Sequence, residues 1–143
     1  MNDVSLLRLY LLRALYLLVA SGLGIVVWPG IIHHARPWEP MEGVVQCMLA
    51  AFGLLSALGI RYPLRMLPIL LWEMLWKGIW LLVVATPLWL RGAMDQPTWE
   101  LASAILLVAL FPFVIPWPYV WSHYVARSGD RWGRATPAAP AAR

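Results

Sequence analysis

The chain has 143 residues, of which 62% are hydrophobic and 13% are charged, and its formal net charge is +4. Soluble domains carry about 25% charged and 45–50% apolar residues, so a globular core cannot absorb this excess of apolar side chains. The composition therefore excludes an ordinary soluble domain and indicates an integral membrane protein.

Four apolar stretches account for the composition, and each reaches the roughly 20 residues that a membrane-spanning helix needs. They are Leu6–Trp28, Met41–Ile60, Met66–Leu90 and Leu101–Trp121. We predict an all-α fold, an integral membrane bundle of four transmembrane helices. Residues 1–127 should form this single membrane domain, and residues 128–143 a cytoplasmic tail that is disordered at its end.

The first span carries small residues on one face, at Ala14, Ser21 and Gly24, where another helix can approach closely. The sequence Trp28-Pro29-Gly30 is expected to end this helix. No small-residue cleavage site follows the apolar run, so the span is interpreted as an uncleaved anchor and not as a signal peptide.

The second span has a small and polar stripe, typical of a helix that packs inside a bundle. The residues of this stripe are Glu42, Gln46, Ala50, Gly53 and Ala57. Glu42 and Gln46 are interpreted as a polar packing contact, with the lining of an outer vestibule as the alternative. Phe52 is expected to face lipid or the greasy side of the bundle. The short connection Gly59–Pro63 predicts that spans two and three form a tight antiparallel hairpin.

The third span places Glu73 and Lys77 near its middle, where a charged side chain costs about 2.5–3.5 kcal/mol on insertion scales. A glutamate four residues before a lysine suits a helical ion pair. Arg13 lies at a similar depth along span one, so we predict that Glu73 accepts hydrogen bonds from both Arg13 and Lys77. A carboxylate between two cations stays ionised, which favours a structural cluster over a proton or ion relay.

Tryptophans recur every four residues beside these charges, at Trp72, Trp76 and Trp80. They could stack a flat pigment or quinone, or hold Lys77 by cation–π contact. The interpretation that we favour is a broad contact surface for lipid or a partner helix. Pro63 is expected to open this span and Thr86-Pro87 to end it.

The fourth span is predicted to start at a Thr98 cap and to be broken by prolines. Three prolines in seven residues, between Pro112 and Pro118, do not fit a regular helix. We expect a kink near Phe111 and a break around Pro116–Pro118.

The arginines predict the topology. Eight lie near the start of span one, at the turn between spans two and three, or after span four, and two lie in the other connections. Positive residues mark the cytoplasmic side, so both termini should be cytoplasmic.

Two segments resemble an uncharacterised group of small bacterial inner-membrane proteins with four predicted spans. The first runs from Gly59-Ile60-Arg61-Tyr62-Pro63 to Trp80-Leu81, and the second is Phe111–Trp117 with the later Gly129-Asp130-Arg131-Trp132. The resemblance implies a bacterial inner membrane. It implies no activity and no site.

The function expected from the sequence is that of a non-enzymatic accessory or scaffolding subunit that acts through helix packing in the lipid bilayer. No nucleophile–histidine–acid arrangement, phosphate loop or zinc spacing is visible in the sequence. We expect a homo-oligomer or a larger membrane complex, with no cofactor, metal or nucleic-acid partner. The alternatives are a small transporter or ion-translocating protein that uses Glu73 and Lys77, and a lipid-, quinone- or pigment-binding module.

Overall fold

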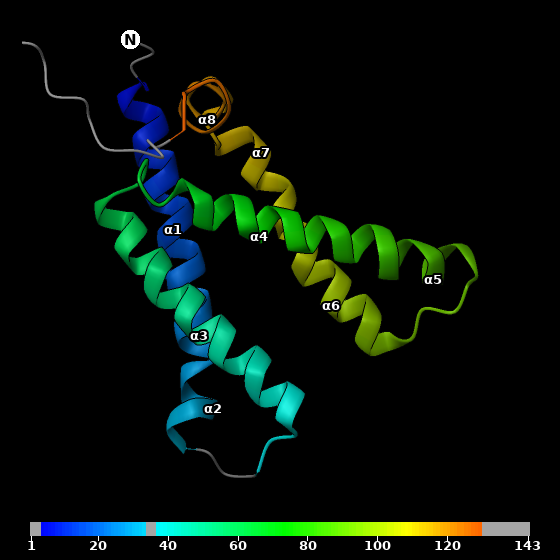
Figure 1. Cartoon of the computed structure of the whole chain (residues 1–143). Coiled ribbons are helices and arrows are strands. Elements are labelled where there is room, and N and C mark those ends of the chain that lie inside the picture. The colour runs from blue at the N-terminus through cyan, green and yellow to red at the C-terminus, as the bar shows by residue number, and fades with distance from the viewer. Residues whose placement is uncertain (1–3, 34–36, 130–143) are drawn as a thin grey trace, which may run out of the picture.

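A computed structural model describes residues 4–33 and 37–129, and within these ranges all regular structure is helical (Figure 1). Four segments are long and apolar enough to cross a membrane: Leu6–His33, Pro40–Arg61, Leu67–Leu90 and Gln96–Val114. The prediction of four helices that are long and apolar enough to span a membrane is therefore confirmed. The tail predicted to be disordered falls largely on residues 130–143, outside the described residues.

The first segment consists of α1 (Leu6–Val26) and the short α2 (Trp28–His33), separated by Val27. Helix α1 ends directly before Trp28-Pro29-Gly30, as expected, but these three residues begin α2 instead of a loop. Pro29 is the second residue of α2, where its missing amide hydrogen breaks no helical hydrogen bond. The proline therefore opens a new helix.

The third segment starts with α4 (Leu67–Trp80), and Pro68 lies in its first turn. Pro63, which was expected to open this helix, lies instead in the turn that follows α3 (Pro40–Arg61) and is buried. Pro68 is the proline that occupies the first turn of the helix, where its missing amide hydrogen costs no helical hydrogen bond.

The same segment continues through η1 (Leu81–Ala85), which is π-helical, into α5 (Thr86–Leu90). The helix does not end at Thr86-Pro87 as expected. Pro87 has no amide hydrogen to donate, and the wider π turn accommodates this gap. Termination comes at Gly92, whose φ of 63° suits glycine. The amides of Gly92 and Ala93 donate to the carbonyls of Trp89 and Leu88 at 3.0 and 2.9 Å.

The fourth segment begins with α6 (Gln96–Leu106), and Asp95, not Thr98, is its cap. The Thr98 amide donates to the Asp95 carboxylate at 3.0 Å. The helical path continues through the 3₁₀ turn η2 (Leu107–Leu110) into α7 (Phe111–Val114).

The proline break after α7 is confirmed. Ile115 is extended, with ψ of 127°, and separates α7 from α8 (Trp117–Val120) and the π-helical η3 (Trp121–Val125). Pro116 cannot donate to the Pro112 carbonyl as a helical residue would. The Trp117 indole donates to that carbonyl instead, at 2.8 Å. The side chain thus satisfies the acceptor that the proline leaves without a partner.

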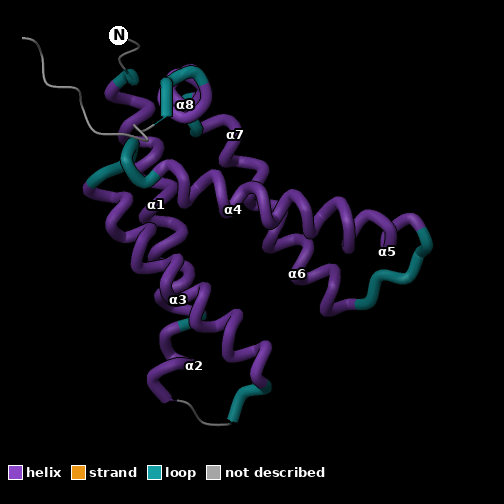
Figure 2. The backbone as a smooth tube through the Cα atoms, viewed as in Figure 1, coloured by secondary structure: helices purple, strands orange, loops and turns teal. Residues whose placement is uncertain are grey.

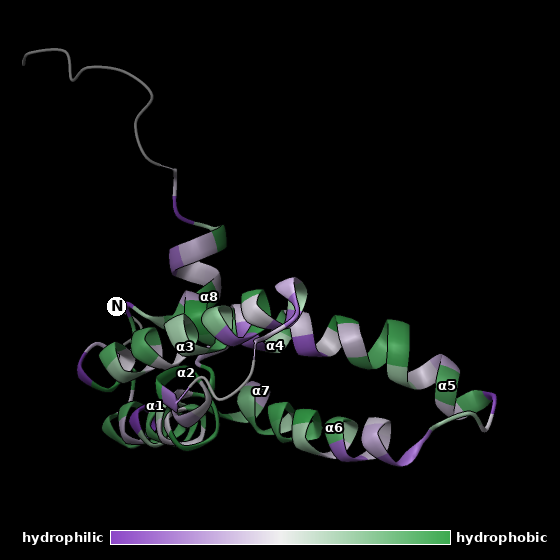
Figure 3. Ribbon diagram, turned by 90° about the horizontal axis from the view of Figure 1, so that it is seen from below, coloured by the Kyte–Doolittle hydropathy of each residue, from purple (hydrophilic) through white to green (hydrophobic). Residues whose placement is uncertain are grey.

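The helices form two arms that diverge from a common end (Figure 1). In one arm α1 and α3 lie side by side, and in the other α4–α5 runs beside α6 (Figure 2). Helices α3 and α4 are joined by a short turn and contact each other at Phe52 and Trp72, but they diverge with distance from the turn, so the expected hairpin is not tight along its length (Figure 1). Hydrophobic residues predominate along both arms, while hydrophilic residues collect mainly near the turns (Figure 3).

Packing between α1 and α3 depends on glycines of α3. A Cβ atom at Gly59 would overlap the Tyr16 ring, and one at Gly53 would lie 3.4 Å from the Leu23 Cβ. The contact thus places large residues of α1 against small residues of α3. On the small face of α1, Ala14 and Ser21 are exposed.

The hydrophobic core lies where the two arms join. Side chains from α1, α4, η2, α7 and the segment after α7 form it: Leu12, Leu15, Tyr16, Leu67, Leu70, Val108, Phe111, Ile115 and Val120. The start of α1 and helix α8 lie at this same end (Figure 1).

Candidate functional site

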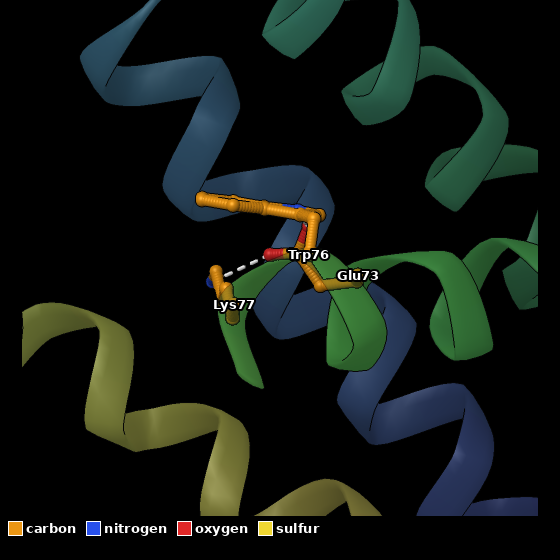
Figure 4. A network of polar contacts seen from close by, with 3 residues as sticks. All are labelled: Glu73, Trp76 and Lys77. Atoms are coloured by element: carbon orange, nitrogen blue, oxygen red, sulfur yellow. Dashed lines mark hydrogen bonds and ion pairs between the residues drawn. The ribbon is translucent and has the colours of Figure 1, made fainter. Parts of the chain in front are cut away.

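Glu73 of α4 is buried, with 4% of its surface exposed, and both of its carboxylate oxygens have a partner (Figure 4). Lys77 Nζ lies 2.5 Å from Oε1, and Trp76 Nε1 donates to Oε2 at 2.8 Å. A carboxylate in a low-dielectric setting is stable only when paired and hydrogen-bonded. Lys77 and Trp76 supply those two requirements.

The local geometry of α4 explains this arrangement. Residues three and four positions apart on a helix share one face, so Trp76 and Lys77 both reach Glu73. The Lys77 ammonium also lies 5.5 Å from the centre of the Trp76 ring, within range of a cation–π contact. Each of the three side chains therefore contacts the other two. The pair Glu73–Lys77 was predicted from its spacing, whereas the role of the Trp76 indole as a donor to Glu73 was missed.

Arg13 does not join this group. Its Nε donates to the Ile60 carbonyl at 3.3 Å, and its guanidinium lies 5.6 Å from the centre of the Tyr10 ring. Similar depth along two helices brings side chains together only where the helices run parallel, and α4 crosses α1 at a wide angle (Figure 1). Arg13 instead supplies a positive charge at the C-terminal end of α3, where carbonyl groups lack helical partners.

A cavity of about 340 Å³ adjoins the ion pair, between α1, α4 and the α6–η2–α7 part of the fourth segment. It is open on one side, where its lining residues Leu18, Val26 and Leu107 are exposed. Glu73 and Lys77 are its charged lining residues. The remaining lining residues are apolar: Leu18, Val19, Gly22, Leu23, Val26, Ala104, Leu107, Val108 and Phe111. The ion pair therefore borders an otherwise hydrocarbon-like space.

The three tryptophans of α4 do not form one surface. Trp72 packs on Phe52 of α3, with ring centres 5.5 Å apart, and lies 6.3 Å from Trp76. Phe52 is thus buried between helices, on the greasy side of the bundle, and does not face lipid. Trp72 and Trp76 line a small apolar cavity of about 220 Å³ against α3, and Trp80 takes no part in it.

The polar stripe of α3 is buried only in part. Glu42 and Gln46 are half-buried near the start of the helix, on a different helix from the ion pair, and the structure does not bring them to Glu73. Ala57 is exposed. The buried face of α3 consists instead of Ala50, Phe52, Gly53, Ser56 and Gly59.

Three hydrogen bonds at the α3–α4 turn form a second polar feature, which sequence reasoning missed. Besides the bond from Arg13 to Ile60, Tyr16 Oη donates to the Pro63 carbonyl at 3.1 Å. Tyr124 Oη donates to the Leu64 carbonyl at 3.3 Å. Side chains from both ends of the sequence thereby hold the turn. Nothing local in the sequence marks these partners, which lie 47 to 60 positions away.

Comparisons with known proteins supply no relative. The chain matches no protein-family model, no curated protein and no solved structure. Within the described residues, no three histidine, cysteine, aspartate or glutamate side chains are placed to hold a metal ion. The geometry around Glu73 and the exposed helix faces is therefore the basis for a functional proposal.

Proposed function

We propose that this chain is a non-enzymatic accessory or scaffolding protein that works in a membrane by packing its helices against another protein or a second copy of itself. The observation that supports this proposal is that the buried carboxylate of Glu73 has a partner at each oxygen, Lys77 at one and Trp76 at the other. A proton or ion carrier needs an oxygen that can release one partner and accept another. Glu73 has both oxygens engaged by residues of its own helix, which suits a fixed structural role.

The exposed small face of α1 supports helix packing as the mode of action. Ala14 and Ser21 are exposed and Gly24 is half-buried, while α3 packs on a different face of α1. In hydrocarbon, helices associate through small residues that allow their backbones to approach closely. A helix from another chain can therefore lie against this face without displacing α3.

The setting proposed for the protein is a bacterial inner membrane with both termini in the cytoplasm. Four spans return the chain to the side where it started, and the start of α1 and helix α8 lie at one end of the molecule (Figure 1). The excess of arginines at that end favours the cytoplasmic side. The resemblance to small four-span proteins favours the bacterial membrane.

Cysteine cross-linking in native membranes tests the packing surface. The lone Cys47 is replaced by serine, and Ser21→Cys then reports on the small face of α1. Leu75→Cys is the matched control, since Leu75 is also exposed but lies on α4. We expect a cross-linked species, formed with a second copy or another membrane protein, for Ser21→Cys and not for Leu75→Cys. Equal yields of cross-linked product from Ser21→Cys and from Leu75→Cys would contradict the packing role of this face.

Ion flux into liposomes tests the transport alternative. The purified chain is expected to give no flux above that of empty liposomes, for protons or for monovalent cations. If the chain alone conducts ions and Glu73→Gln stops the flux while leaving the protein folded, Glu73 is a carrier and the scaffolding proposal is wrong.

A further inference from the structure

The cavity beside the ion pair has the size and lining of a binding site for a small hydrophobic molecule. Ligand pockets span roughly 300–1,000 Å³, and a 150 Å³ apolar cavity in a protein core holds benzene. At about 340 Å³, the cavity between α1, α4 and α6–η2–α7 has room for a body of one or two rings, which could enter from the side where the cavity is open. Its apolar walls favour a molecule that partitions into hydrocarbon.

Lys77 supplies a polar group that can orient such a molecule. An ammonium has three hydrogen-bond donors. Within the part of the chain that the structure describes, Glu73 is the one hydrogen-bond acceptor for Lys77, and the Trp76 ring lies beside the ammonium. The lysine side chain is 19% exposed and borders the cavity. A ligand oxygen in the cavity can therefore accept from a donor that the protein leaves available.

The charge of the site selects a neutral acceptor. Glu73 already neutralises Lys77, so the pair has no net charge for an anion to balance. A carboxylate in the cavity would approach Glu73 in a medium of low dielectric, where like charges repel strongly. A carbonyl oxygen accepts a hydrogen bond from an ammonium without that penalty. The site thus favours a carbonyl compound over a fatty acid anion.

Depth excludes the ester carbonyls of ordinary membrane lipids. Lys77 lies near the middle of the 24-residue segment Leu67–Leu90. The edge of the hydrocarbon core is roughly 15 Å from its midplane, and ester carbonyls remain near that edge. A carbonyl that reaches Lys77 must belong to a molecule that moves freely within the hydrocarbon.

We propose that this cavity binds a neutral, ring-shaped carbonyl compound of the quinone class, with one carbonyl oxygen accepting a hydrogen bond from Lys77 Nζ and the ring lying among the apolar residues of α1, η2 and α7. The proposal concerns binding only and assigns no redox step. It does not depend on the scaffolding role, because a bound quinone is compatible with a protein that packs against a partner.

Two probes of the same ring size isolate the carbonyl contact. The full-length chain in detergent is dialysed against 1,4-naphthoquinone or against naphthalene, and uptake by empty micelles is subtracted. A hydrogen bond to a charged donor corresponds to about a tenfold or greater difference in dissociation constant. We expect naphthoquinone to bind the wild-type chain more tightly than naphthalene by at least that factor.

Two glycines of α1 give a matched pair of variants for the cavity itself. A Cβ at Gly22 or at Gly24 would meet no atom within 4 Å, so α1 accepts a larger residue at either position. Gly22 lines the cavity and Gly24 does not. Gly22→Leu is expected to fill the cavity and abolish saturable binding of both probes. Gly24→Leu makes the same chemical change two residues away and should bind as the wild type does.

The double variant Glu73→Gln/Lys77→Met tests the donor without leaving a lone buried charge. It is expected to bind naphthoquinone no more tightly than naphthalene, while naphthalene binding stays as in the wild type. Equal binding of the two probes to the wild-type chain would overturn the proposal without any mutation. Binding that survives Gly22→Leu in a folded protein, or the retention of phospholipid alone, would overturn it as well.

Discussion

At the scale of single residues, the stability of the protein should depend on whether one or both charges of the α4 ion pair are removed. A buried pair contributes little net stability, since desolvation of two charges offsets their attraction, but a lone buried charge is strongly destabilising. Glu73 and Lys77 are adjacent on one helix and both border the apolar cavity. Their removal should therefore be strongly non-additive.

A double-mutant cycle measures this coupling. We expect Glu73→Gln and Lys77→Met each to lower the free energy of unfolding by about 3 kcal/mol or more. The double variant should lie closer to the wild type than either single variant. Denaturant unfolding in mixed micelles gives the three differences. Additive effects would show that the two charges do not depend on each other.

The sequence predicted the contacts of this site that lie within one helical turn. It did not predict those that depend on how separate helices pack. Glu73 and Lys77 were paired correctly because four positions along a helix fix their separation. Trp76 was placed beside them, but the direction of its indole depends on what the neighbouring helices leave open. The partner of Arg13 depends on how α1 and α4 cross, which no local pattern records.

At the scale of elements, α1 and α3 approach closely because α3 has no side chain at Gly59. The Tyr16 ring occupies that space and is fully buried. Three positions earlier on α3, Ser56 is also fully buried, and its hydroxyl has no hydrogen-bond partner within the described part of the chain. Substitution by alanine is therefore expected to change the stability of the protein in opposite directions at Gly59 and at Ser56.

Alanine substitution separates these two cases. Gly59→Ala should destabilise the protein by about 1–3 kcal/mol, because the added methyl group overpacks the Tyr16 ring. Helix propensity alone would predict the opposite sign. Ser56→Ala should be neutral or stabilise by up to about 1 kcal/mol, because it removes an unpaired buried hydroxyl. Thermal unfolding midpoints in one detergent give the comparison, and a stabilising Gly59→Ala would contradict the observed packing.

The cap of α6 makes the stability of this helix start depend on pH. Hydrogen bonds from the Thr98 side chain and then from its backbone amide hold the pKa of Asp95 below its ordinary value of 3.8. The ionised carboxylate therefore stabilises the start of α6 above pH 3.8. That contribution is lost as the pH falls further, through the lowered pKa of the folded protein.

Hydrogen exchange at the Thr98 amide checks this prediction. Its protection factor should fall as the pH is lowered below 3.8 in the wild type. Asp95→Asn keeps a good cap that cannot ionise, so its protection should not change over the same range. Asp95→Ala should show low protection at every pH. An identical acid response in the wild type and in Asp95→Asn would indicate that another group is responsible.

At the scale of the whole molecule, the α3–α4 turn connects the two arms. Tyr16 from α1 and Tyr124 from η3 donate to adjacent carbonyls of this turn. The hydrophobic core lies at the same end, and the arms separate with distance from it (Figure 1). The turn and the core together set the angle between the arms.

Removal of each tyrosine hydroxyl tests how strongly the turn is held. Tyr16→Phe should lower the free energy of unfolding by about 1–3 kcal/mol, because the buried Pro63 carbonyl loses its donor. Tyr124→Phe should lower it by less than about 1 kcal/mol, because Tyr124 is 45% exposed and its acceptor can find other donors. A larger effect for Tyr124→Phe would mean that the C-terminal contact, and not the α1 contact, fixes the turn.

The sequence by itself determined four apolar helices, the proline break of the fourth and the pairing of Glu73 with Lys77. These features follow from length, composition and neighbours within one helical turn. Tertiary structure decided that α3 packs on α1, that α4 diverges from α3 and that Arg13 and Tyr16 serve the turn. The reason is that all four long helices are apolar, so hydrophobicity alone does not distinguish one helical partner from another. Complementary shape selects the partner helices, and the fit of the Tyr16 ring against Gly59 forms only when α1 and α3 are packed together.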